Sequence, residues 1–136
     1  MATFDDPQAA EDAYYDAFDE HDLDKMMSVW ADSDETVCLL PMLMAIKGTK
    51  AIRQAYEPLL KNDSGFEIQV GHMHWIKTDE LAIHLVEEAV KVPNAPPQSV
   101  YATNIFQKNE SGSWHMTMHQ NSPLPMEPPT PEQMQS

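Results

Sequence analysis

The sequence is poor in several kinds of residue, and each shortage argues against a class of protein. It has a single cysteine, Cys38, so an intramolecular disulfide cannot form. The first 30 residues lack the basic start and apolar core of a secretory signal, and a reducing, cytoplasmic location is expected. The strand-like segment around Cys38 indicates a small buried side chain, and a reactive thiol is the alternative.

Long apolar runs, glycines and positive charges are also scarce. No stretch approaches the roughly 20 apolar residues that a membrane-spanning helix needs. Only four glycines occur, and none forms a phosphate-binding loop, so nucleotide chemistry is not expected. Eight Lys and Arg against 22 Asp and Glu give a formal charge of −14, which repels nucleic acid and anionic membranes. Neither is expected as a partner.

What the chain does contain is enough apolar material for one core. A length of 136 residues with 42% hydrophobic residues is typical of one domain. This domain is expected to span residues 1–123. Residues 124–136 are rich in proline and poor in packing residues, which is typical of an extended or disordered tail.

The first half of the chain has helical periodicity. Asp5 and Asp6 precede Pro7 as a helix start, and Asp22 is a suitable N-cap for a second, shorter helix. A third helix is predicted after Gly48. The apolar stripes of the three helices are Ala10, Ala13, Tyr14, Ala17 and Phe18; Leu23, Met26, Met27 and Trp30; and Ile52, Ala55, Tyr56, Leu59 and Leu60.

The second half has strand-like segments separated by turn residues. A short strand is expected over residues 36–41, and four longer ones over 66–77, 81–92, 100–108 and 114–122. Four strands with short connections form an antiparallel meander. Helices followed by a sheet predict an α+β fold, with the three helices packed on one face of a curved antiparallel sheet.

Several segments together resemble the NTF2-like superfamily and, within it, the SnoaL-like branch of small bacterial proteins. They are the acidic aromatic first helix, the Asp-Leu-Asp start of the second, Trp30, the helix entry at 48–52 and the final segment 114–123. The resemblance covers about residues 7–123. It implies a cone with a pocket between the sheet and the first helices, and a homodimer through the outer sheet face. Members include isomerases, dehydratases, cyclases and non-catalytic proteins.

The last strand, SWHMTMHQNSP, separates two environments if its side chains alternate. Trp114, Met116, Met118 and Gln120 would then face one side, and His115, Thr117, His119 and Asn121 the other. Metal binding by His115 and His119, or by His72 and His74, lacks a third ligand beside either pair. The favoured interpretation places six polar residues at the dimer interface: His72, His74, His115, Thr117, His119 and Asn121.

The adjacent pair Glu87-Glu88 is the strongest clue to chemistry. Adjacent strand residues face opposite sides, so one carboxylate must point inward if both faces are covered. The row that continues from Leu81, Ile83 and Leu85 is the more apolar, which predicts that Glu87 faces the interior. A desolvated carboxylate there would have a raised pKa, as a general base requires. The alternative is a solvated Glu87, or one paired with Lys91.

Asn104 is the second candidate, since the resemblance implies that it faces the pocket; a hydrogen bond to Gln120 is its structural alternative. The resemblance also implies that Tyr14, Trp30 and Met42 line the mouth, although aromatic residues at helical spacing, such as Tyr14 and Trp30, are more often simply part of the core. The predicted pocket residues are Tyr14, Trp30, Met42, Leu85, Glu87, Asn104, Phe106, Met118 and Gln120.

Two functions from different classes fit these residues. The first is a binding protein whose pocket holds a small, mostly apolar ligand, and the high methionine content favours this adaptable kind of site. The alternative is a cofactor-independent isomerase, dehydratase or cyclase acting on a carbonyl compound. In it Glu87 is the base, and Asn104 or Tyr14 polarises the oxygen. No metal or cofactor is expected in either case.

Overall fold

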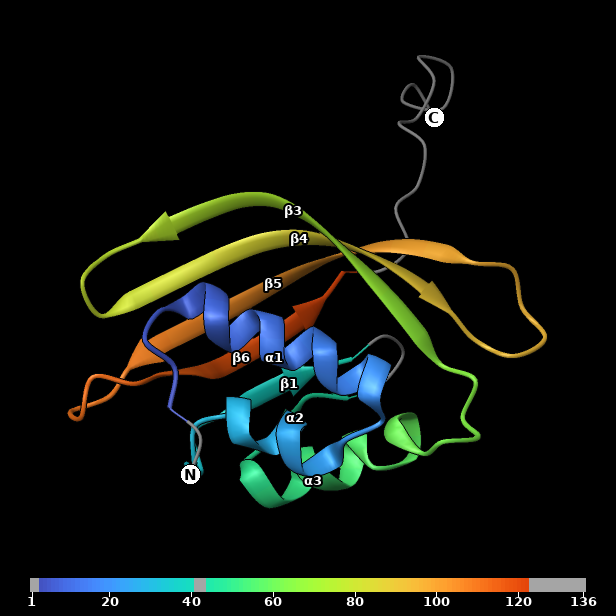
Figure 1. Ribbon diagram of the computed structural model, residues 1–136, viewed down its shortest axis with the longest axis horizontal. Helices are drawn as coiled ribbons and strands as arrows, with labels where there is room; N and C mark the ends of the chain where they lie inside the picture. Colours follow the sequence, from blue (N-terminus) through green and yellow to red (C-terminus); the bar gives the residue numbers. More distant parts are fainter. Residues whose placement is uncertain (1–2, 41–43, 123–136) are drawn as a thin grey trace, which may run out of the picture.

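Helices pack under the concave face of a strongly curved six-stranded sheet (Figure 1). The computed structural model describes residues 3–40 and 44–122. The helices are α1 (Pro7–Glu20), α2 (Leu23–Val29), α3 (Thr49–Tyr56) and the 3-10 turn η1 (Pro58–Leu60). The strands are β1 (Val37–Leu39), β2 (Ile46–Lys47), β3 (Glu67–Lys77), β4 (Leu81–Lys91), β5 (Gln98–Lys108) and β6 (Trp114–Asn121). The predicted α+β class and the three helices are therefore confirmed.

The strand order is β2-β1-β6-β5-β4-β3. Strands β3 to β6 form the predicted antiparallel meander. Strand β1 pairs with β6 in parallel, however, and with the short β2 in antiparallel orientation. The sheet is thus mixed, which corrects the prediction of an all-antiparallel sheet.

The helix boundaries follow from local capping chemistry. Asp6 caps α1 by accepting a hydrogen bond from the Ala9 N–H at 2.7 Å, directly before Pro7. Asp22 caps α2 in the same way by accepting from the Lys25 N–H at 3.0 Å, as predicted. Gly48 precedes α3 with a φ of 90°, a conformation that favours glycine.

Helix α1 provides most of the packing against the sheet, and its buried face carries aromatic rings. Tyr14 lies at the centre, with edge-on contacts to Tyr15, Phe18 and Tyr56. Opposite these rings, the inner row of β4 carries small or polar side chains: Ala82, His84, Val86 and Glu88. The helix also contributes buried polar groups, Glu11 and Tyr15.

Two β-bulges change which side chains face the helices. In β3 the pairing with β4 shifts between His72 and His74, so Met73 is the extra residue. In β6 the pairing with β5 passes from Phe106↔Met116 to Ile105↔Met118, so Thr117 is the extra residue. After each bulge, the alternation of inward and outward side chains is reversed.

The bulges overturn part of the predicted dimer interface. His119 and Asn121 were expected on the outer face, but they are buried on the inner face, 1% and 6% exposed. His72 and His74 were expected on one face, but His72 stacks on the inward-facing His84, and His74 pairs with the outward-facing Leu85. His115 and Thr117 are half-buried and line a cavity beside helix α2.

The inward prediction for Glu87 is also wrong. Glu87 is exposed, whereas Glu88 is 1% exposed and lies in the inner row with Ala82, His84 and Val86. Leu85, which was predicted in the pocket, is 39% exposed on the outer face. The apolar row was a poor guide because the rings of α1 leave room only for small or polar side chains inside.

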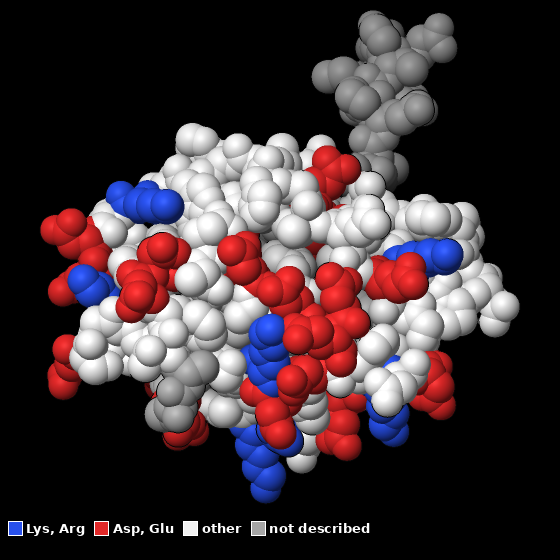
Figure 2. Space-filling view, in the orientation of Figure 1, with Lys and Arg blue, Asp and Glu red and all other residues white. Residues whose placement is uncertain are grey.

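Acidic side chains gather over the helical layer (Figure 2). Asp12, Asp16 and Asp19 of α1 line a surface groove beside β3. None of the helices in the described ranges is long and apolar enough to cross a membrane. The predicted tail 124–136 and the predicted pocket residue Met42 lie outside the described residues.

Candidate functional site

A cavity of about 750 Å³ opens between α1, β1, η1 and the ends of β3 to β6, and is called the inner cavity below. Its walls are mostly apolar. Its polar part is formed by Glu88, His119 and Asn121, close to the ring of Tyr14. The remaining lining residues are Phe18, Leu39, Leu40, Leu59, Phe66, Ile68, Val90, Val92, Gln98, Val100, Gln120 and Ser122.

The polar groups of the inner cavity belong to a closed ring of hydrogen bonds, the polar ring. The Tyr15 hydroxyl donates to Glu88 Oε2 at 2.8 Å, and Asn121 Nδ2 donates to Glu88 Oε1 at 2.7 Å. His119 joins the two amides, with Nε2 2.9 Å from Asn121 Oδ1 and Nδ1 2.5 Å from Asn104 Oδ1. Asn104 Nδ2 closes the ring by donating to the Tyr15 hydroxyl at 3.1 Å.

The ring places both nitrogens of His119 against amide oxygens. Asn121 turns its N–H toward Glu88 and its oxygen toward His119. Asn104 likewise donates to the Tyr15 hydroxyl and presents its oxygen to His119. Both nitrogens of His119 are therefore engaged within the ring, and Nε2 also lies 3.8 Å from Glu88 Oε2.

A second buried pair, Glu11 and His84, is attached to the polar ring through Asn104. Asn104 Nδ2 donates to Glu11 Oε2 at 3.2 Å, and His84 Nδ1 lies 2.8 and 2.7 Å from the two Glu11 oxygens. Desolvation raises the pKa of Glu11 to about 7 and lowers the pKa of His84 to about 4. Between these values both groups are uncharged and share one proton, so no unbalanced charge is buried.

Tyr14 connects the inner cavity with the core on its other side. Its hydroxyl is 2.7 Å from that of Tyr56, which lies 3.4 Å from Cys38 Sγ. Burial raises the pKa of Tyr14 well above its ordinary value, so the hydroxyl keeps its proton. Its ring also lies against the ring of His119, with the centroids 5.1 Å apart.

Cys38 provides a first testable prediction. Burial raises its thiol pKa to about 11, and the side chain is fully buried, so little thiolate is present or accessible at pH 8. Iodoacetamide should leave the folded chain unmodified over a time in which the urea-unfolded chain is fully alkylated, as measured by intact mass. Equal alkylation rates in the two states would contradict the burial of this thiol.

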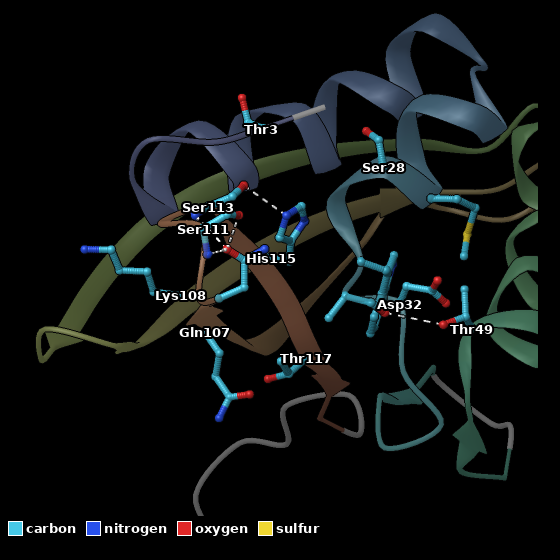
Figure 3. A pocket seen from close by; sticks show the side chains of 14 residues that line it. Thr3, Ser28, Asp32, Thr49, Gln107, Lys108, Ser111, Ser113, His115 and Thr117 are labelled. Carbon is cyan, nitrogen blue, oxygen red and sulfur yellow. Dashed lines mark hydrogen bonds between the residues drawn. The ribbon is translucent and has the colours of Figure 1, made fainter. Parts of the chain in front are cut away.

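A second cavity, of about 610 Å³, lies between α2 and the β5–β6 hairpin (Figure 3). In this side cavity, Ser113 holds the ring of His115 through a 2.9 Å contact between Ser113 Oγ and His115 Nε2. Trp30 Nε1 and His115 Nδ1 are buried without a hydrogen-bond partner in the described part of the chain. Asn109 Oδ1 accepts from the Ser111 hydroxyl and the Ser113 N–H, so the hairpin turn positions the serine that contacts His115.

The structure brings together only part of the predicted pocket. Tyr14 and Gln120 line the inner cavity, and Asn104 lies behind its wall as the central residue of the polar ring. Trp30 lines the side cavity instead. Phe106 is fully buried in the core, and Met118 is half-buried on the face opposite His119.

The sequence analysis missed four residues of the site: Glu11, Tyr15, His84 and Glu88. One signal was available in the helix, because Glu11 is three and seven residues before Tyr14 and Phe18 and so shares their buried stripe. Glu88 was considered, together with Glu87, as one of two residues that could point inward. His84 and Tyr15 had no signal of their own, because their partners come from segments distant in the sequence.

Residues 8–127 match the SnoaL-like domain family over most of the chain. The chain belongs to the SnoaL-like domain family. This confirms the predicted resemblance, and structures of NTF2-like proteins agree with it. Comparison with curated proteins gives no match.

Several solved structures are similar to this SnoaL-like chain. A candidate calcium/calmodulin-dependent protein kinase type II association domain from Thiobacillus denitrificans is 31% identical, with a TM-score of 0.81 over 92% of this chain and 100% of that one. A candidate NTF2-like dehydratase from Streptomyces avermitilis is 21% identical, with a TM-score of 0.70 over 86% and 93% of the two chains. A cystatin-like protein of unknown function from Nostoc punctiforme is 13% identical, with a TM-score of 0.69 over 90% of each chain. The similarity to the Streptomyces and Nostoc proteins shows a shared fold and nothing more.

Proposed function

We propose that this SnoaL-like protein binds a small, mostly apolar molecule in the inner cavity. The supporting observation is a cavity of about 750 Å³ whose apolar walls end at the buried polar groups of Glu88, His119 and Asn121. An apolar cleft of this size with a few convergent polar groups is the usual form of a small-molecule site. The polar end orients the ligand, and the apolar walls provide most of the affinity.

The polar ring also indicates which group the ligand presents. Both nitrogens of His119 are already engaged by the amide oxygens of Asn104 and Asn121. Each oxygen of Glu88 accepts one hydrogen bond and retains a lone pair. Asn121 Nδ2 carries two hydrogens and uses one of them on Glu88, so the polar end keeps a donor as well as acceptors. It therefore suits an apolar molecule that carries a hydroxyl group, which can both donate and accept.

A substitution in the cavity wall tests this proposal. Val100 lies in the wall, 5% exposed, so Val100→Phe should fill part of the cavity. Nile red fluorescence titrated with the purified protein should show at least tenfold weaker binding for this variant. Ser99→Phe adds the same ring at the exposed neighbouring position and should bind as the wild type does. Unchanged binding by a folded Val100→Phe chain would exclude the inner cavity as the site.

A cofactor-independent isomerase or dehydratase is the second candidate. The observation that favours it is a buried carboxylate, Glu88, whose free lone pairs lie in the wall of a mostly apolar cavity. The fold is shared with a candidate dehydratase. Deuterium uptake from D₂O beside the carbonyl of a cavity-filling ketone would demonstrate proton transfer. Its absence with a ketone that binds would exclude it.

The outer sheet face supports a homodimer as part of the same proposal. Large apolar residues lie exposed there, among them Ile76 (56%), Leu85 (39%) and Tyr101 (40%). The Thiobacillus relative is described as an association domain, which fits a subunit contact. Native mass spectrometry of freshly purified protein should show a dimer, with any retained ligand as an added mass. A monomer at micromolar concentration would refute this assembly.

A further inference from the structure

We propose that Glu11, His72 and His84 form a binding site for one divalent transition-metal ion, with Zn²⁺ as the probe that tests it. One potential ligand atom from each residue lies within 4.8 Å of the others. Two imidazoles and one carboxylate are a common donor set for zinc, with further positions left for water or a ligand. The sequence analysis found no third ligand beside His72 and His74, whereas the fold brings Glu11 and His84 next to His72.

The separations between the donor atoms suit a single ion. His84 Nδ1 lies 2.7 Å from Glu11 Oε2, and His72 Nδ1 lies 3.3 Å from Glu11 Oε1. Ligands about 2.0–2.1 Å from one zinc ion are separated from each other by about 2.9–3.4 Å. Small side-chain movements are therefore sufficient to place an ion between the three atoms.

The three residues differ in burial: two are fixed inside the fold, and the third is exposed and able to turn. Glu11 and His84 are fully buried between α1 and β4, and Asn104 holds the carboxylate through its 3.2 Å hydrogen bond. His72 is 48% exposed and stacks parallel to His84, with the centroids 5.2 Å apart. Its ring must turn to point a lone pair at the ion, and its exposure allows this. Two ligands are thus fixed, and the third closes over the ion.

A route for the ion is provided by the acidic groove beside the site. Asp12, Asp16 and Asp19 line this groove together with Val70, which precedes His72 in the inner row of β3. Acidic side chains also gather on the surface of the helical layer (Figure 2). Such a surface raises the local concentration of cations next to the buried carboxylate.

The bulge at Met73 provides a matched pair of variants. His72→Asn removes a proposed ligand, and His74→Asn makes the same change two residues away on the opposite face. Zn²⁺ is titrated by competition with a chromophoric chelator, with excess Mg²⁺ present to occupy surface carboxylates. The wild type and His74→Asn should each bind one Zn²⁺ per chain with equal affinity. His72→Asn should bind at least tenfold more weakly.

A second variant tests the buried carboxylate. Glu11→Gln keeps the shape of the side chain and should also weaken Zn²⁺ binding at least tenfold. If this variant does not fold, the two exposed histidine variants remain informative. Binding that fails to saturate at one ion per chain would overturn the site. Equal affinity of His72→Asn and His74→Asn would overturn it as well.

Discussion

Asn104→Leu should lower the free energy of unfolding by about 3–5 kcal/mol, a large share of the total for a domain of this size. Asn104 is fully buried and makes three hydrogen bonds, to Glu11, Tyr15 and His119. Leucine matches its shape but leaves the buried Nδ1 of His119 without its partner. It also removes the donor shared by Glu11 and Tyr15.

Urea denaturation followed by circular dichroism measures this loss, and the slope of the transition should remain unchanged. Thr103→Val is the control, because Thr103 is the neighbouring residue on the outer side of β5 and makes none of these bonds. Its stability should lie within about 0.5 kcal/mol of the wild type. A loss of stability below about 1 kcal/mol for Asn104→Leu would contradict this prediction. It would mean that water molecules satisfy the polar groups that Asn104 contacts at little cost in free energy.

Glu88→Gln should destabilise the fold by about 2–4 kcal/mol, whereas Glu87→Gln should change stability by less than about 0.5 kcal/mol. Glu88 is buried and accepts from two donors, Tyr15 and Asn121. A glutamine carries one acceptor and one donor group, so one of these donors would face an N–H. Glu87 is exposed and has no such role.

The two adjacent glutamate variants are compared in the same urea titration, and ligand binding is measured on both. Any binding or proton transfer in the inner cavity should be lost with Glu88→Gln and kept with Glu87→Gln. The reverse order of stabilities would show that strand β4 presents its other face to the helices. That result would contradict the register in which Glu88 pairs with Val100.

The order of the elements could be predicted from the sequence because each depends on nearby residues. Asp6 and Asp22 cap the helices that follow them, and the turns between strands are local as well. The parallel pairing of β1 with β6 could not be predicted in this way, since it joins Val37 to Met118 across most of the chain. It depends on how the helices return the chain to the sheet.

The site was less predictable than the fold because it depends on which way each strand faces. Strict alternation placed His119 and Asn121 outside, and the extra residue Thr117 placed them inside. For β4, the apolar row was taken as the inner one. Side-chain polarity was misleading there because the outer face also carries large apolar residues such as Leu85.

The bulge at Thr117 makes the chemistry of the interior depend on one residue that stands outside the regular pairing. If Thr117 took a regular place in the ladder with β5, the residues after it would slip by one position, which would turn Met118 and Gln120 inward and His119 and Asn121 outward. The cone would keep its shape, and a methionine and a glutamine would replace the histidine and asparagine of the polar ring. A register shift of one residue can therefore exchange one kind of ligand for another in a single step, which point substitutions would need several changes to achieve.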